Sequence, residues 1–210
     1  MSEGQGRPRP RIESLADLIF GLSLSIGALA LIASPPSSPA DIDSHILAFA
    51  FTFMLLITSW IIYTADMSVL PVHTRLVTFL NVILLMMVAI VPYLLNNVEF
   101  SNPALGSSAA LALKDYASSL FGIDLAGIII ILAIFSHILA MEEKQLVAPE
   151  VAKTYRGVRN LLFFLAALLL VSLAPLFWTL TLLGVPLRLY MWYIPILVYW
   201  VRRLREPSSG

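Results

Sequence analysis

Long apolar runs recur along the whole chain and constrain its fold more than any other feature. A helix needs about 20 apolar residues to cross the hydrocarbon core of a bilayer. Six segments meet this requirement: Leu15–Ala33, Ile46–Ala65, Leu76–Leu95, Gly122–Met141, Leu161–Leu180 and Leu187–Val201. Only 12% of the 210 residues are charged, against about 25% in a soluble domain. The sequence therefore predicts an all-α integral membrane protein with six transmembrane helices.

Lysine and arginine gather on one side of the membrane if these segments cross it in turn. Cytoplasmic loops carry an excess of both residues, so we expect this side, and with it both chain termini, to be cytoplasmic. It holds Arg7, Arg9, Arg11, Arg75, Lys144, Lys153, Arg156, Arg159, Arg202, Arg203 and Arg205, whereas Lys114 and Arg188 fall on the other side. The predicted organisation is a disordered cytoplasmic N-terminus (1–10), a six-helix domain (11–205) and a C-terminal tail (206–210).

The first span has several distinct faces when it is wound at 100° per residue. One stripe is apolar and consists of Leu15, Leu18, Leu22, Ile26 and Leu29, with Ser25 at its edge. A second stripe consists of the small residues Ser23, Gly27 and Ala30, which suit close contact between helices. A helix with such different faces is expected to pack inside a bundle and not to lie exposed to lipid.

Asp17 is a carboxylate in the apolar register of the first span, about two turns beyond Arg11. A charge there is costly unless it is paired or hydrated, so Asp17 is a functional-site hypothesis by default. The alternative is that Asp17 marks the inner membrane interface and caps or pairs locally. The periodicity alone leaves both interpretations open.

Three motifs follow one another along the first three spans. They are Arg11-x-x-x-Leu15-Ala16-Asp17-x-x-Phe20-Gly21-Leu22, "SWIIY" from Ser59 to Tyr63, and "LNVILLMMVAIVP" from Leu80 to Pro92. In this order they resemble the R-x-x-x-F-S-D-x-x-F-A-I, the Y-W-x-x-H and the asparagine–apolar run–proline patterns of the TMEM175 family of potassium channels. The last three spans agree with the family's short prokaryotic six-helix type in number, length and orientation.

The resemblance implies a homotetramer around a central pore that is lined by the first helix. It further implies that a ring of apolar side chains replaces a backbone-carbonyl filter, and the chain indeed has no TVGYG-like loop. The family's filter isoleucine falls on Leu22, and the next pore-facing apolar positions fall on Ile26 and Leu29. Ser25 stands where the family usually has threonine. These positions share the stripe that the helical wheel gives independently.

The resemblance also implies a polar network that holds the first helix in place, here built from Arg11, Asp17, Trp60 and Tyr63. The chain departs from the family at two of the positions involved. Ala16 replaces a serine, and Tyr63 replaces a histidine. A tyrosine hydroxyl can donate to a carboxylate, but it does not change charge near neutral pH as histidine can. Leu22 replaces a β-branched residue, which changes the shape of the expected constriction.

The leading functional hypothesis is a potassium-conducting leak channel in the cell membrane. The alternative is a secondary transporter, which would have broken helices, paired midplane charges and inverted repeats. We expect no enzyme activity, because no catalytic cluster lies within the spans. We also expect no cofactor other than permeant K⁺ and no metal site, since the chain lacks cysteine and its histidines lack metal-ligand spacing. The zero net charge gives no indication of nucleic-acid binding.

Overall fold

The computed structural model describes residues 11–33, 35–36, 38–70, 74–99, 107–141 and 147–205. The long helices in this part are α1 (Arg11–Ala33), α2 (Pro39–Met67), α3 (Arg75–Glu99), α4 (Ser107–Ala140), α5 (Pro149–Val171) and α7 (Leu187–Arg205). Between α5 and α7 lie a short helix α6 (Pro175–Thr179) and a hairpin of two-residue strands, β1 (Thr181–Leu182) and β2 (Val185–Pro186). The segments predicted as terminal tails, 1–10 and 206–210, lie outside the described residues.

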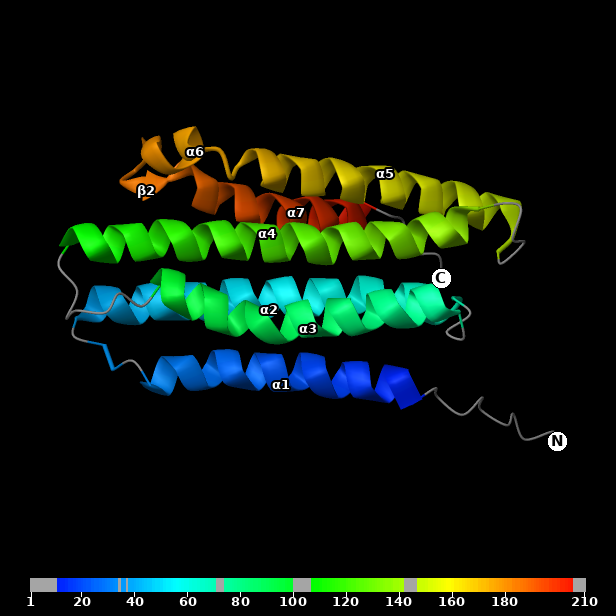
Figure 1. Ribbon diagram of the computed structural model, residues 1–210, viewed down its shortest axis with the longest axis horizontal. Coiled ribbons are helices and arrows are strands. Elements are labelled where there is room, and N and C mark those ends of the chain that lie inside the picture. The colour runs from blue at the N-terminus through cyan, green and yellow to red at the C-terminus, as the bar shows by residue number, and fades with distance from the viewer. Residues whose placement is uncertain are drawn as a thin grey trace.

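The long helices run in alternating directions and form an elongated bundle (Figure 1). The helix α1 lies at one edge, where it packs against α2 and α3. The helix α4 is central, because it packs against α3 on one side and α5 on the other. The N-terminal end of α1 and the C-terminal end of α7 both lie toward the same end of the bundle. The ends of α2 and α4 and the starts of α3 and α5 also lie toward that end.

Five helices in the described residues are long and apolar enough to cross a membrane. These segments are Ser14–Ala33, Pro39–Met67, Arg75–Val98, Ser108–Ala140 and Pro149–Val171. The chain is therefore a multi-pass membrane protein by the length and composition of its helices. The helix α7, which contains the predicted sixth span Leu187–Val201, does not belong to this set; it has 19 residues and carries Arg188 near its start and Arg202, Arg203 and Arg205 in its last turn.

Capping explains where α2 begins. The predicted span starts at Ile46, but the helix starts at Pro39, since Ser38 and Asp41 form a capping box at its N-terminus. The Ser38 hydroxyl accepts from the Asp41 backbone N–H at 3.2 Å, and the Asp41 carboxylate accepts from the Ser38 N–H at 3.0 Å. Two backbone donors are thereby satisfied, which stabilises a helix start.

The predicted bounds of the fifth span, Leu161–Leu180, are wrong. The helix α5 already begins at Pro149 and ends at Val171, and Pro175 starts the separate helix α6. Proline lacks a backbone N–H and is well suited to the first turn of a helix but not to its interior. The hairpin that follows turns at Leu183 and Gly184, which have positive φ angles of 53° and 79°. The fourth helix also begins earlier than predicted, at Ser107.

Aromatic packing joins α7 to the core of the bundle. The Phe121 and Trp192 rings lie 4.4 Å apart between centroids, and Phe51 lies 6.2 Å from Phe121. These residues come from α4, α7 and α2 respectively. On another face of α4, Gly127 permits a close approach of the Met87 side chain from α3. The core therefore holds α4 at the centre and leaves α1 at the edge.

Candidate functional site

The apolar stripe of α1 is exposed on the outside of the bundle. The exposed fractions are 47% for Leu15, 66% for Leu18, 56% for Leu22, 42% for Ile26 and 60% for Leu29. The stripe thus faces away from the helices α2 and α3 that hold α1. Within a single chain, the residues predicted as a pore lining are free to meet lipid, a neighbouring subunit or a central pore.

Ser25 lies next to this stripe and is also exposed. Its hydroxyl donates to the Gly21 carbonyl of the same helix at 2.9 Å. A serine that bonds to a carbonyl one turn earlier satisfies its own donor without leaving the helix surface. The Ser25 hydroxyl oxygen still has acceptor capacity toward whatever occupies this face.

The opposite face of α1 attaches the helix to its own bundle. Ala16, Phe20 and Ser23 are buried, with exposed fractions of 0%, 3% and 1%. A Cβ atom placed on Gly27 would lie 3.6 Å from the Thr52 methyl group of α2. The small-residue stripe of α1 therefore makes its close helix contact within the chain, against α2.

The structure brings together two of the four residues predicted to anchor α1. The Trp60 indole Nε1 donates to the Asp17 carboxylate at 2.9 Å, which links α1 to α2. Tyr63 instead packs against Phe20, with 5.9 Å between the ring centroids, and its side chain is 2% exposed. The side chain of Arg11 lies outside the described residues. Asp17 and Trp60 thus form a polar contact at the start of α1, and Tyr63 adds apolar packing beside it.

Removing the Asp17–Trp60 contact is expected to loosen α1. Trp60→Phe removes the indole donor and keeps most of the packing, and Asp17→Asn removes the charge of the acceptor. Each should lower the free energy of unfolding by about 1 kcal/mol, as is typical of a partly exposed hydrogen bond. Thermal unfolding in detergent measures this effect.

The double variant tests whether Asp17 and Trp60 stabilise the protein through their contact with each other. If the two groups stabilise the protein through one another, Asp17→Asn with Trp60→Phe should cost clearly less than the sum of the single changes. Ser25→Ala is the matched control, because among the described residues its hydroxyl bonds to Gly21 of α1 itself. Fully additive single effects would show that Asp17 acts independently of Trp60.

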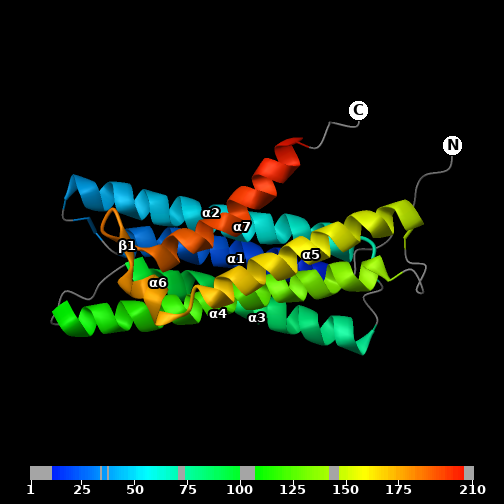
Figure 2. The ribbon, with the colours of Figure 1, turned by 90° about the horizontal axis from the view of Figure 1, so that it is seen from above.

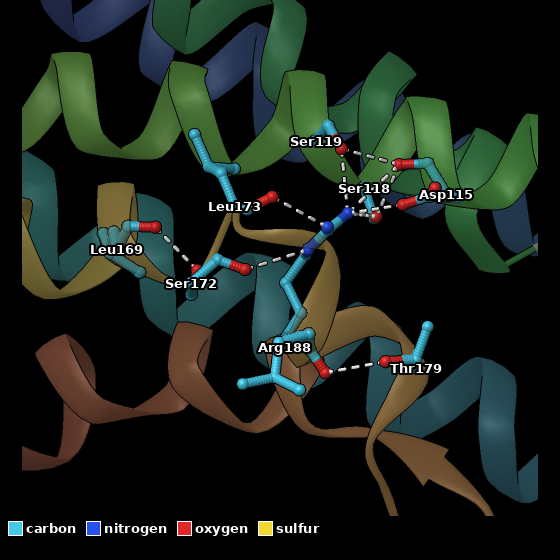
Figure 3. A network of polar contacts seen from close by, with 9 residues as sticks. Asp115, Ser118, Ser119, Leu169, Ser172, Leu173, Thr179 and Arg188 are labelled. Carbon is cyan, nitrogen blue, oxygen red and sulfur yellow. Dashed lines mark hydrogen bonds and ion pairs between the residues drawn. The ribbon is translucent and has the colours of Figure 1, made fainter.

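A second polar cluster is centred on Arg188, which the sequence placed on the side opposite to most basic residues. Its side chain is 2% exposed, and its guanidinium lies against α4 (Figure 3). Nη1 is 2.7 Å from the Asp115 carboxylate, 2.9 Å from the Ser118 hydroxyl and 2.8 Å from the Ser119 hydroxyl. Arg188 therefore ties the start of α7 to the N-terminal half of α4.

The same guanidinium also binds the turn after α5. Its Nε donates to the Ser172 carbonyl at 3.1 Å and Nη2 donates to the Leu173 carbonyl at 3.1 Å. Its carbon atom lies 5.4 Å from the ring centroid of Trp178, within cation–π range. These carbonyls belong to the end of a helix, where no intrahelical donor reaches them. Arg188 supplies the missing donors and joins α4, the α5–α6 turn and α7.

Sequence reasoning assigned no function to Arg188. The available signal was its position, since it is one of two basic residues that the predicted topology places on the outer side and it starts an apolar segment. Its partners are serines and carbonyls far away in the sequence, which no local pattern identifies. Its geometry is that of a structural anchor, because Nε, Nη1 and Nη2 each donate to acceptors of the protein itself.

Of the comparisons with known proteins, the one with solved structures gives a match. No protein-family model and no curated protein sequence match the chain. A solved structure does match, namely the crystal structure of a lysosomal potassium-selective channel TMEM175 homolog from Chamaesiphon minutus, with a TM-score of 0.62 and 18% sequence identity. The match covers 91% of this chain and 96% of that one. The resemblance to TMEM175 is therefore confirmed at the level of the fold.

Proposed function

We propose that this chain is the subunit of a potassium-conducting cation channel in the cell membrane, a homotetramer of six-span subunits with cytoplasmic termini. The observation that carries the proposal is the exposed apolar stripe of α1, on a fold shared with a potassium-selective channel homolog. A central pore needs several copies, since one chain supplies one copy of each helix. The stripe is the face that four copies of α1 would turn toward a common axis.

The proposed mechanism is passive conduction through an apolar constriction. Leu22 of each subunit would form the narrowest ring, and Ile26 and Leu29 would follow about one and two turns outward. An apolar ring offers no ligand that replaces water, so an ion crosses it only after losing part of its hydration shell. The cost of that loss differs between K⁺ and Na⁺, which gives a basis for selectivity without a carbonyl filter.

The anchoring of α1 supports this arrangement. Phe20 and Ser23 bury one face of α1 in its own subunit, and Asp17 bonds to Trp60 at its inner end. The opposite face is thereby fixed in direction. A stripe that is held in this way could set the width of a pore reproducibly in all four subunits.

Ion flux into liposomes tests the proposal directly. We expect purified protein to form assemblies of four chains by native mass determination. In liposomes it should conduct K⁺ down its gradient, with a flux that does not saturate at carrier-like rates. Empty liposomes and heat-denatured protein are the controls. Saturation at carrier-like rates, or strict coupling to a second ion, would instead favour the alternative of a secondary transporter, and a stable monomer would rule out a central pore.

A further inference from the structure

The α6–hairpin segment, residues 175–187, connects α5 to α7 and is apolar and largely exposed. It contains no charged residue. Four of its leucines have exposed fractions of 59% for Leu176, 49% for Leu180, 54% for Leu182 and 91% for Leu183. Contiguous exposed apolar patches mark surfaces that meet a protein partner or a membrane. The segment is therefore a candidate interaction surface.

The turn of the hairpin places a leucine where the backbone favours another residue type. Leu183 and Gly184, the two residues between β1 and β2, have φ angles of 53° and 79°. Two-residue hairpin turns with positive φ at both positions favour asparagine or aspartate followed by glycine. A bulky residue rarely adopts positive φ, and a side chain that is 91% exposed gains little packing within the described chain. A contact outside the chain would account for a leucine at this tip.

The backbone of the segment is hydrogen-bonded in the way that an apolar environment requires. The Leu180 carbonyl accepts from the Leu187 N–H at 2.8 Å, and the Leu180 N–H donates to the Leu176 carbonyl at 2.9 Å. The Leu182 carbonyl accepts from the Tyr190 hydroxyl at 3.0 Å. Unpaired backbone groups are costly in hydrocarbon, where no water replaces the missing partner. These bonds allow the two leucine side chains to enter lipid without leaving their carbonyls unpaired.

The segment lies at the level of the long helices and not beyond them. In two views at right angles, α6 and the hairpin lie toward the end of the bundle opposite to the start of α1, and the first turns of α4 extend beyond them (Figure 1, Figure 2). Trp178 and Tyr190 flank the hairpin in the sequence. Tryptophan and tyrosine are enriched at the membrane–water interface. Both observations favour a place in the interfacial region of one leaflet.

We propose that the α6–hairpin segment inserts Leu182 and Leu183 into the bilayer leaflet at this end of the bundle and thereby anchors the start of α7. The partner is lipid hydrocarbon and not a second copy of the chain. Fluid acyl chains can surround a side chain that is 91% exposed, whereas a protein surface would cover one side of it. A segment without charge also avoids the high cost of placing a charged group in hydrocarbon. The inference rests on the chain lying in a bilayer, and it does not depend on ion conduction.

Fluorescence quenching in liposomes tests the insertion. The chain has no cysteine of its own, so Leu183→Cys, or Val185→Cys with that leucine kept, carries a single NBD label. Ala40→Cys is the matched control, because Ala40 is exposed in the first turn of α2 beside Asp41. Iodide on both sides of the bilayer reports contact with water, and doxyl-labelled phosphatidylcholine reports contact with acyl chains. We expect doxyl lipid to quench the hairpin labels, iodide to leave them largely unquenched, and iodide to quench the label at position 40.

Two substitutions at the tip separate backbone strain from lipid contact. Asparagine adopts positive φ more readily than leucine does, but its amide suits water and not hydrocarbon. Leu183→Asn should therefore lower the melting temperature in liposomes if lipid surrounds the turn, and raise it if water does. Leu183→Met keeps an apolar side chain and the same backbone conformation, so it should melt close to the wild type.

Several outcomes would overturn the proposal. Iodide quenching at positions 183 and 185 as strong as at position 40 would place the hairpin in water. Labels at the hairpin that neither quencher reaches would show that protein covers it, and a second copy of the chain would then be the partner. A higher melting temperature for Leu183→Asn would show polar surroundings, and an equal loss in Leu183→Met would show that side-chain shape and not polarity decides.

Discussion

Replacing Arg188 by methionine is expected to lower the free energy of unfolding by about 3 kcal/mol or more. Methionine fills much of the same volume but donates no hydrogen bond. The Ser172 and Leu173 carbonyls would lose the hydrogen-bond donors that Arg188 supplies. The loss would occur in a buried site, because Arg188 is 2% exposed. These acceptors belong to the backbone and cannot be removed with the arginine. The measurement is thermal or denaturant unfolding in detergent.

The controls distinguish this network from a simple ion pair. Asp115→Asn should cost clearly less than Arg188→Met, because the Asp115 side chain is 44% exposed and exposed pairs contribute little. Arg188→Lys should recover only a small part of the loss, since an ammonium group cannot reach α4 and both carbonyls at once. Lys114→Met, on the same side of the molecule and outside the described Arg188 contacts, should be nearly neutral. If Asp115→Asn were as damaging as Arg188→Met, the ion pair would dominate instead.

The sequence predicted those parts of the helices that a continuous local run of apolar residues identifies. Apolar runs of the required length identify the central parts of α1 to α4, and the helical wheel correctly separates the exposed Leu22 from the buried Phe20 and Ser23. The helix boundaries depend on individual capping residues and prolines. The start of α2 is fixed by the hydrogen bonds between Ser38 and Asp41, which an apolar-run criterion ignores. The break at Pro175 lies within an apolar stretch, so a prediction based on hydropathy extended the fifth span across it.

The site residues also differ in how far the sequence identifies them: some belong to local motifs, whereas others depend on contacts between residues far apart in the sequence. The motifs named Asp17 and Trp60 together, and the Trp60 indole Nε1 lies 2.9 Å from the Asp17 carboxylate; whether this contact anchors a pore helix stays a prediction. They did not show that Tyr63 packs against Phe20, because that contact depends on the rotation of α2. The contacts of Arg188 span up to 73 positions of sequence separation and could not be derived from spacing. The role of Leu22 is still a prediction, since it concerns copies of the chain that surround a common axis.

Replacing Leu22 by alanine tests that role. If four copies of Leu22 form the narrowest ring, Leu22→Ala should widen it, admit hydrated ions and raise cation flux about tenfold, which corresponds to about 1.4 kcal/mol of barrier. Leu22→Asn should also raise flux, because an amide hydrates a ring that would otherwise exclude water. In Leu22→Ala, the preference for K⁺ over Na⁺ should fall because both ions would cross with more of their water. Flux into liposomes under K⁺ and Na⁺ gradients measures both effects.

Two neighbouring positions on α1 make the experiment specific. Ile26→Ala lies on the same stripe one turn outward and should change flux less than Leu22→Ala. Phe20→Ala removes a ring that is 3% exposed and packs against Tyr63. It should lower the melting temperature more than it alters ion preference, since a buried phenylalanine replaced by alanine costs about 3–5 kcal/mol. All variants are compared at equal protein density after four-chain assembly has been verified. Unchanged flux and unchanged preference in an intact Leu22→Ala tetramer would show that the pore, if present, is lined by other residues, because a constriction cannot lose four leucine side chains without becoming wider.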